Sequence, residues 1–248
     1  MEMSKPFLRI CQLLLGLFGL ISTLYVAVEF IYFISVPKVQ PYRKDSDVVT
    51  WSLLVNVALL SVFYLQHSLM ATSKMKDIFQ AYGFEMVFRS VYSIATSGIL
   101  LCLIRNWKTT NVILWSLNLN YKPLWWLFVS AHIVAWVVIY VSNMCRDVTE
   151  LLGLKQVFYS LRNLPDPNLK KSVEYQNLNN HMRHPSFSAF ALLFWFTPLM
   201  SLDRMLLAVI LTGYMYVTWN TTRNDYYYVK YQLERKRFSL DHSDIFKN

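Results

Sequence analysis

Residues 10–28 of the chain read ICQLLLGLFGLISTLYVAV and carry no charged side chain. A helix that spans the hydrocarbon of a bilayer needs about 20 predominantly apolar residues. The apolar run extends to roughly 7–36, which is too long for a signal peptide, and it lacks a small-residue cleavage site. This stretch therefore predicts a helix that stays in a membrane.

The composition of the whole chain points the same way. Of the 248 residues, 55% are apolar and only 16% are charged, and the mean hydropathy is +0.30. A soluble domain has about 25% charged residues. An aromatic content of 16% excludes a disordered chain, and three cysteines without paired spacing exclude a disulfide scaffold.

Five further apolar segments follow the first, so the sequence predicts an all-α integral membrane protein with a bundle of about six transmembrane helices. The predicted spans are approximately 7–36, 48–70, 87–104, 124–144, 187–200 and 205–219. The last two are separated only by residues 201–204, which predicts a tight helical hairpin, and Pro198 can kink or end the fifth helix. A hairpin that crosses only part of the bilayer remains an alternative.

No separate soluble domain is expected, so residues 1–248 form a single polytopic membrane domain. A cytosolic or nucleoplasmic segment covers 145–186, and a basic tail covers 220–248. The net charge is +9, and with six spans 17 of the 24 Lys and Arg residues lie on the side that holds both termini. The positive-inside rule places that side in the cytoplasm or nucleoplasm.

Polar and ionisable side chains in the predicted spans are expensive there and usually face the interior of a bundle. Those that converge on the side of the termini are His67, Arg89, Arg183, His184, Arg223 and Asp225, and the others are Glu29, Asn56, Gln66 and His132. Each arginine is equally consistent with a side chain that extends to the interface. The two span histidines, His67 and His132, also fit ordinary hydrogen-bonded packing.

The segment before the fifth helix, residues 180–187, carries the strongest chemical signal. Pro185 disfavours a helical His184 and suits the first turn of the helix that follows. Free backbone N–H groups beside Arg183 and His184 would attract a carboxylate or phosphate. The sixth helix delivers Arg223 and Asp225 toward the same side. An ordinary helix start with an arginine at the membrane edge fits the same residues.

Two weaker signals remain. His181 and His184 have a metal-like spacing but no nearby carboxylate or cysteine pair, so no metal site is expected. The basic triplet at 235–237 follows a tyrosine-rich interface segment and is typical of a positive-inside anchor. Binding to anionic lipid and a nuclear-type basic signal are its alternatives.

Several stretches resemble the nurim family of multi-pass inner nuclear membrane proteins, and together they cover nearly the whole chain. They are residues 28–30, 66–71, 89–92, 150–159, 183–185, 197–198 and 203–208. The sequences QHSLM at 66–70 and GLKQV at 153–157 are the more specific ones. The resemblance implies a location in the inner nuclear membrane or the endoplasmic reticulum membrane, which are continuous.

The nurim family is similar in turn to methanethiol S-methyltransferases and, more distantly, to isoprenylcysteine carboxyl methyltransferases. Those enzymes bind S-adenosylmethionine through Arg-His-Pro-x-Tyr-x-Gly and a later acidic pair. In this chain Phe187 and Ala189 replace the Tyr and Gly, and Asn224 replaces one acid. The resemblance implies cofactor binding by Arg183, His184, Pro185 and Asp225. Arg223 is a further candidate because the sixth helix delivers it to the same side. His67 and His184 are the candidates to accept a thiol proton.

Two functions are consistent with these residues. In the first, the chain is a non-enzymatic nuclear-envelope protein with a methyltransferase-like core, whose basic face contacts membrane lipids, lamina or chromatin. In the second, it is an S-adenosylmethionine-dependent methyltransferase that acts on a thiol or a lipid-borne acceptor. A transporter or channel is disfavoured because the sequence has no broken-helix repeat. No sequence-specific nucleic-acid binding is expected, and the sequence does not set an oligomeric state.

Overall fold

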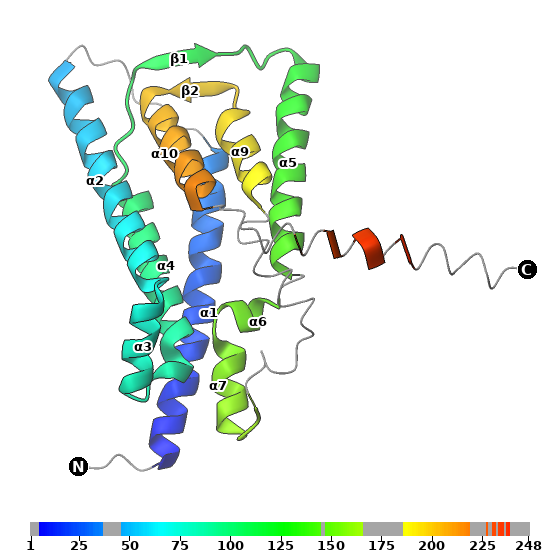
Figure 1. Ribbon diagram of the computed structural model, residues 1–248. Helices are drawn as coiled ribbons and strands as arrows, with labels where there is room; N and C mark the ends of the chain where they lie inside the picture. Colours follow the sequence, from blue (N-terminus) through cyan, green and yellow to red (C-terminus); the bar gives the residue numbers. More distant parts are fainter. Residues whose placement is uncertain are drawn as a thin grey trace, which may run out of the picture.

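The computed structural model describes residues 5–36, 46–144, 147–165 and 186–218, and within the tail residues 227, 230–231, 233–235 and 237–238. The fold is mostly helical (Figure 1). Its elements are α1 (Lys5–Ser35), α2 (Ser46–Met70), α3 (Ser73–Ala81), the 3-10 turn η1 (Glu85–Val87), α4 (Phe88–Asn106), β1 (Ile113–Ser116), α5 (Lys122–Met144), α6 (Val148–Leu151), α7 (Leu154–Leu161), α9 (Phe187–Trp195), β2 (Leu199–Ser201) and α10 (Leu202–Thr218).

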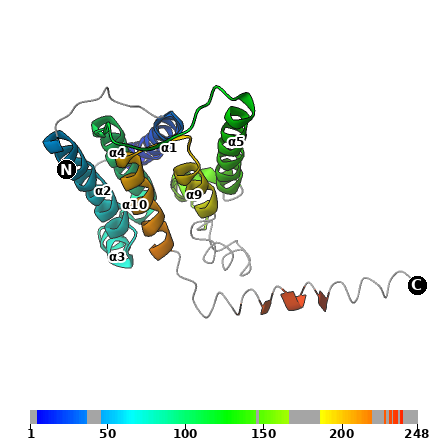
Figure 2. The same cartoon turned by 90° about the horizontal axis from the view of Figure 1, so that it is seen from above.

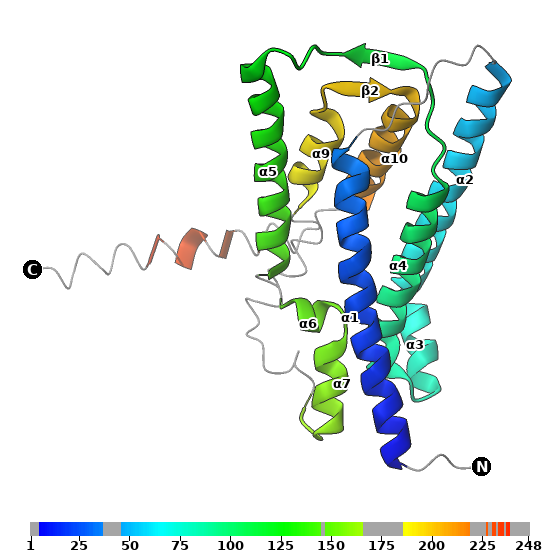
Figure 3. The ribbon, with the colours of Figure 1, turned by 180° about the vertical axis from the view of Figure 1, so that it is seen from behind.

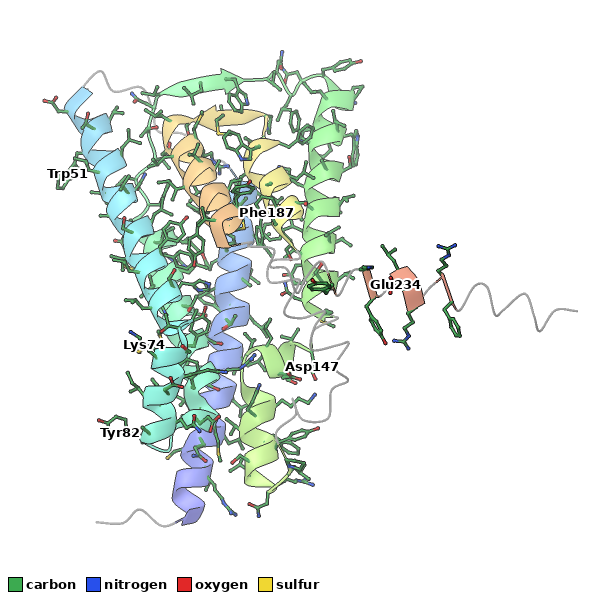
Figure 4. The ribbon with its side chains drawn as sticks, in the orientation of Figure 1. Trp51, Lys74, Tyr82, Asp147, Phe187 and Glu234 are labelled. Atoms are coloured by element: carbon green, nitrogen blue, oxygen red, sulfur yellow. The ribbon has the colours of Figure 1, made fainter. Side chains whose placement is uncertain are left out.

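Four of the helical segments are long and apolar enough to cross a membrane: Arg9–Ser35, Asp47–Met70, Glu85–Asn106 and Lys122–Met144. In the most apolar windows of α1, α2 and α5 only 17% of the residues are buried inside the protein. Trp51, for example, is 66% exposed and points away from the bundle (Figure 4). Apolar surface of this extent suits contact with lipid rather than with water.

The last two predicted spans differ from the expectation. α9 ends at Trp195, well before residue 200, because Pro198 has no N–H and cannot continue a helix. α10 begins at Leu202, three residues earlier than predicted. The predicted turn at 201–204 is therefore wrong, since β2 and the first turn of α10 occupy those residues. At 1.5 Å per residue the nine residues of α9 measure about 14 Å, roughly half of the hydrocarbon thickness.

The helices pack around α1, which contacts α4, α7 and α9, while α2 packs on α4 and α10, and α5 packs on α9 (Figures 1 and 2). Small side chains allow α1 and α4 to approach closely. A Cβ on Gly19 would lie 3.3 Å from the carbonyl oxygen of Ser90, and the hydroxyls of Thr23 and Ser97 are 3.0 Å apart. Such interfaces are typical of helices that associate in lipid.

A short antiparallel ribbon closes the end of the bundle opposite the start of α1 (Figure 3). β1 pairs with β2, with Ile113 opposite Ser201 and Ser116 opposite Leu199. The ribbon joins the α4–α5 connection to the α9–α10 connection, so the tip of the last hairpin lies at the same end as the start of α5. The sequence did not predict these strands.

Candidate functional site

His67 in the last turn of α2 lies at a junction of α2, α4 and α10. Its ring Nδ1 is 2.8 Å from the hydroxyl of Tyr92 on α4. The ring stacks on Phe63 with centroids 5.7 Å apart and meets Tyr214 of α10 edge-on at 6.3 Å. Residues 63 and 67 are one turn apart on α2, which is why their side chains meet.

The same junction continues along α2. The rings of Tyr64 and Tyr214 are 4.3 Å apart, and the hydroxyl of Ser68 lies 3.0 Å from that of Tyr214. We call these residues the His67 cluster: Phe63, Tyr64, His67, Ser68, Tyr92 and Tyr214. It combines an imidazole, three phenols and a hydroxyl within the apolar part of the bundle.

Two polar atoms at this junction lack a hydrogen-bond partner among the described residues. They are the hydroxyl of Tyr64 and the side-chain oxygen of Gln66, both buried. The amide nitrogen of Gln66 does donate, to the hydroxyl of Thr96 at 3.3 Å. A buried polar group without a partner costs about 1–3 kcal/mol, so such groups indicate a site for water or a bound molecule.

A second polar cluster surrounds α6. Asp147 caps this short helix with φ at 60°, and its carboxylate accepts hydrogen bonds from the backbone N–H groups of Thr149 and Glu150. Lys155 donates to Asp147 at 2.7 Å. This hydrogen bond lowers the pKa of Asp147 to about 2 and raises the pKa of Lys155.

Arg89 belongs to this second cluster. Its guanidinium donates to the backbone carbonyl of Glu150 at 3.5 Å, and Gln156 donates to the same oxygen at 3.0 Å. Gly153, with φ at 90°, brings the α6–α7 turn against α4. A Cβ there would lie 2.7 Å from the Cβ of Arg89 and 2.8 Å from the nitrogen of Ser90.

Other polar residues singled out in the sequence hold elements together. The buried Asn56 side chain bonds both the N–H and the carbonyl of Lys108 at 2.9 and 2.7 Å. His132 lies 2.8 Å from the carbonyl of Phe196, just beyond α9. Glu29 pairs with Arg105 at 2.8 Å. None of these three sets requires a ligand.

Sequence reasoning missed Asp203 and Arg204, which it assigned to a turn. Asp203 is 1% exposed and accepts hydrogen bonds from Trp107 and Thr110. Arg204 donates to the carbonyls of Phe33 and Ile34 at the end of α1. An adjacent acid and base between two apolar segments is the signal that could have predicted a buried, paired site.

The predicted cofactor residues Arg183, His184, Pro185, Arg223 and Asp225 lie outside the described residues. Of the predicted site residues, His67 is the one that the structure places. The structure adds its neighbours Tyr92 and Tyr214. Among the residues that the structure describes, no group of three or more His, Cys, Asp and Glu side chains could hold a metal ion.

Comparison with known proteins decides the family. The chain is 36% identical over 236 residues to the nurim homologue of Drosophila melanogaster, an alignment that covers 88% of this chain and 91% of that protein. The chain belongs to the nurim family. Nurim of Danio rerio is 37% identical over 193 residues, covering 76% of this chain and 70% of the relative. Mouse nurim is 34% identical over 189 residues, covering 75% and 72%.

No family model and no solved structure matches this nurim-family chain. The resemblance expected from the sequence is confirmed by these relatives. With four helices able to cross a membrane, the chain is a nurim-family multi-pass membrane protein.

Proposed function

We propose that this nurim-family protein is a six-span protein of the inner nuclear membrane, with both termini in the nucleoplasm. The observation that carries the proposal is the match to nurim proteins over most of the chain. The β1–β2 pairing supports six spans, because it brings the tip of the α9–α10 hairpin to the end of the bundle where α4 finishes and α5 begins.

The nucleoplasmic face would carry most of the basic residues and contact lamina, chromatin or anionic lipid. In the proposed topology 17 of the 24 Lys and Arg residues lie there. A basic face of this kind attracts polyanions and negatively charged membrane surfaces. The proposed role is structural, with the helical core as a tightly embedded anchor.

Topology is tested with two variants that each carry a glycosylation cassette. In the first the cassette lies between Asn118 and Asn120, in the connection after β1. In the second it lies at the C-terminus. Glycosylation of the first insertion alone, with the natural sequon at Asn220 unmodified, supports the six-span topology. Glycosylation of the C-terminal insertion contradicts it.

Location is tested separately with a C-terminal epitope. An epitope in the inner nuclear membrane is stained only after full permeabilisation, whereas staining after digitonin alone places the protein in the endoplasmic reticulum.

We infer a second candidate function, S-adenosylmethionine-dependent methyl transfer, from the His67 cluster. The unpartnered hydroxyl of Tyr64 and the rings of Tyr92 and Tyr214 fit a bound cationic group, because aromatic faces attract cations. Arg183, His184, Pro185 and Asp225 would hold the polar ends of the cofactor, as the family resemblance implies, and Arg223 is a further candidate. When bound, the cofactor would supply the methyl group.

His67 would then act on the acceptor. A thiol must lose its proton to become nucleophilic, and an imidazole within hydrogen-bond reach can take that proton. The hydroxyl of Tyr92 lies 2.8 Å from Nδ1 of His67, and as acceptor of an Nδ1–H bond it would orient the ring and leave Nε2 to take the proton. The acceptor would be a thiol or a lipid-borne group that enters between helices, and most of the rate gain would come from positioning.

The test is S-adenosylmethionine binding to the full chain in detergent, measured by calorimetry. Saturable binding that is lost in Arg183→Ala and Asp225→Ala supports the second function. His67→Asn is expected to keep cofactor binding and to lose transfer to a thiol. His132→Asn is the matched control, since His132 contacts a backbone carbonyl away from the cluster. Absence of binding at millimolar cofactor contradicts the second function and leaves the first unaffected.

A further inference from the structure

A hollow of about 550 Å³ lies between the start of α1 and the end of α7. Its polar lining consists of Arg9 and Gln12 from α1, and Ser160 and Asn163 from α7 and the residues just after it. Leu161 and Leu164 provide apolar walls. The hollow is separate from the His67 cluster and shares no residue with it.

Arg9 brings a positive charge to this hollow and has no carboxylate partner among the described residues. Arg105 and Lys155 pair with carboxylates, and Arg89 donates to a backbone carbonyl. Arg9 makes no ion pair or hydrogen bond with any described residue, and the same holds for the side-chain amides of Gln12 and Asn163. Among the described residues, the Ser160 hydroxyl contacts the sulfur of Met86, which is a weak acceptor. In this part of the chain, the lining therefore offers one cation and several hydrogen-bond donors, and its described residues include no carboxylate.

The position along α1 places the hollow at the level of lipid headgroups. α1 ends at Ser35, near the end of the bundle that the ribbon closes. The apolar stretch Arg9–Ser35 has 27 residues and is about 40 Å long, which matches the thickness of about 40–45 Å of a bilayer with both headgroup layers. Arg9, the first residue of that stretch, therefore lies at the level of the headgroups on the opposite side.

We propose that this hollow binds the phosphate group of an anionic membrane lipid. Arg9 supplies the counter-charge, and Gln12, Ser160 and Asn163 donate hydrogen bonds to the phosphate oxygens. Charge-assisted bonds of this kind are stronger than neutral ones. Leu161 and Leu164 contact the glycerol and the first acyl carbons. The site requires only that the chain sits in a membrane, so it does not depend on the nuclear location or on methyl transfer.

The test measures binding of phosphatidic acid, presented in mixed phosphatidylcholine micelles, to the full chain in detergent. Arg9→Gln is expected to weaken binding about tenfold or more, because one ionic contact is lost. Arg105→Gln is the matched control. It removes the same charge at the end of α4, far from the hollow, and its binding is expected to stay within about twofold of the wild type.

A second variant guards against misfolding of Arg9→Gln. Ser160→Phe narrows the hollow, removes one donor and keeps Arg9, and it is also expected to lose binding. The proposal is overturned if both variants bind phosphatidic acid as the wild type does, or if Arg105→Gln loses as much as Arg9→Gln. Competition with inorganic phosphate and glycerol 3-phosphate identifies the source of the phosphate. No competition at millimolar concentration indicates a lipid, and full competition indicates a soluble phosphate ester in the same site.

Discussion

At the scale of single residues, hydrogen bonds to Asp203 hold the bundle together at the end that the ribbon closes. The carboxyl group of Asp203 accepts from the indole of Trp107 at 3.0 Å and from the nitrogen and hydroxyl of Thr110 at 2.9 and 2.8 Å. These bonds tie the start of α10 to the segment after α4. An acid in this position is retained because its partners are buried with it.

Replacement of Asp203 by alanine leaves three donors without an acceptor. We expect Asp203→Ala to destabilise the protein by about 3 kcal/mol, since each buried donor without a partner costs about 1 kcal/mol or more. Asp203→Asn keeps one carbonyl oxygen and is expected to lose roughly half as much. Thermal unfolding in detergent measures both. Equal stability of Asp203→Ala and the wild type would show that the bonds contribute nothing.

Gly153 is the residue where a side chain is least tolerated. Its φ of 90° is strained for any other residue, and a Cβ would clash with Arg89 and Ser90. We expect Gly153→Ala to cost about 3 kcal/mol. Gly83→Ala is the control, because Gly83 has a similar φ of 75° but nothing within 4 Å of a Cβ. It should cost only about 1 kcal/mol, so equal losses in the two variants would rule out the clash as the cause.

At the scale of elements, α6 and α7 form a short hairpin against α1 and α4, fixed by Asp147 as much as by apolar contacts. Asp147, which Figure 4 labels beside α6, both caps α6 and pairs with Lys155. Asp147→Ala should destabilise the hairpin by about 1 kcal/mol through loss of the cap. Asp147→Asn, which keeps the cap and tolerates the positive φ, should have a smaller effect. Hydrogen exchange over α7 compares the two, and similar protection in both variants would contradict the capping role.

The pKa of Asp147 also gives this hairpin a pH dependence. Because the folded pKa of about 2 lies below the ordinary value, the stabilisation is complete above about pH 4 and is lost as the pH falls toward 2. The effect is expected to be small, since the Asp147 side chain is 40% exposed. Asp147→Asn should remove the difference in unfolding midpoint between pH 5 and pH 3. An unchanged difference in that variant would assign the pH dependence to other groups.

How much the sequence could predict depended on the length of each element. α1, α2, α4 and α5 were predictable because each is a long apolar run. β1 and β2 were not, because strands of four and three residues have little local pattern and pair across more than eighty residues of chain. His67 was predictable as a costly residue in a span. Its partners Tyr92 and Tyr214 were not, since tyrosine is common throughout the chain and only the packing selects these two.

At the scale of the whole molecule, the outward apolar surface of α1, α2 and α5 makes the bilayer part of the folded state. The chain should therefore remain in the membrane pellet after high salt and after alkaline carbonate, and enter solution only with detergent. Arg9→Gln and Arg105→Gln should behave as the wild type, because neither changes the apolar surface. Release of the protein by salt alone would contradict an integral membrane fold.

The ribbon of β1 and β2 also constrains the order of synthesis. Ribosomes make β1 long before β2, so β1 has no partner strand while α5, α6 and α7 are synthesised. The later hairpin then has to carry Asp203 and Arg204 to that same end as one unit. α9 is too short to insert alone, and Trp107, Thr110 and the last carbonyls of α1 are already in place to receive those charges. We therefore expect a late docking step in biogenesis, in which the α9–α10 hairpin packs onto α1 and the segment after α4.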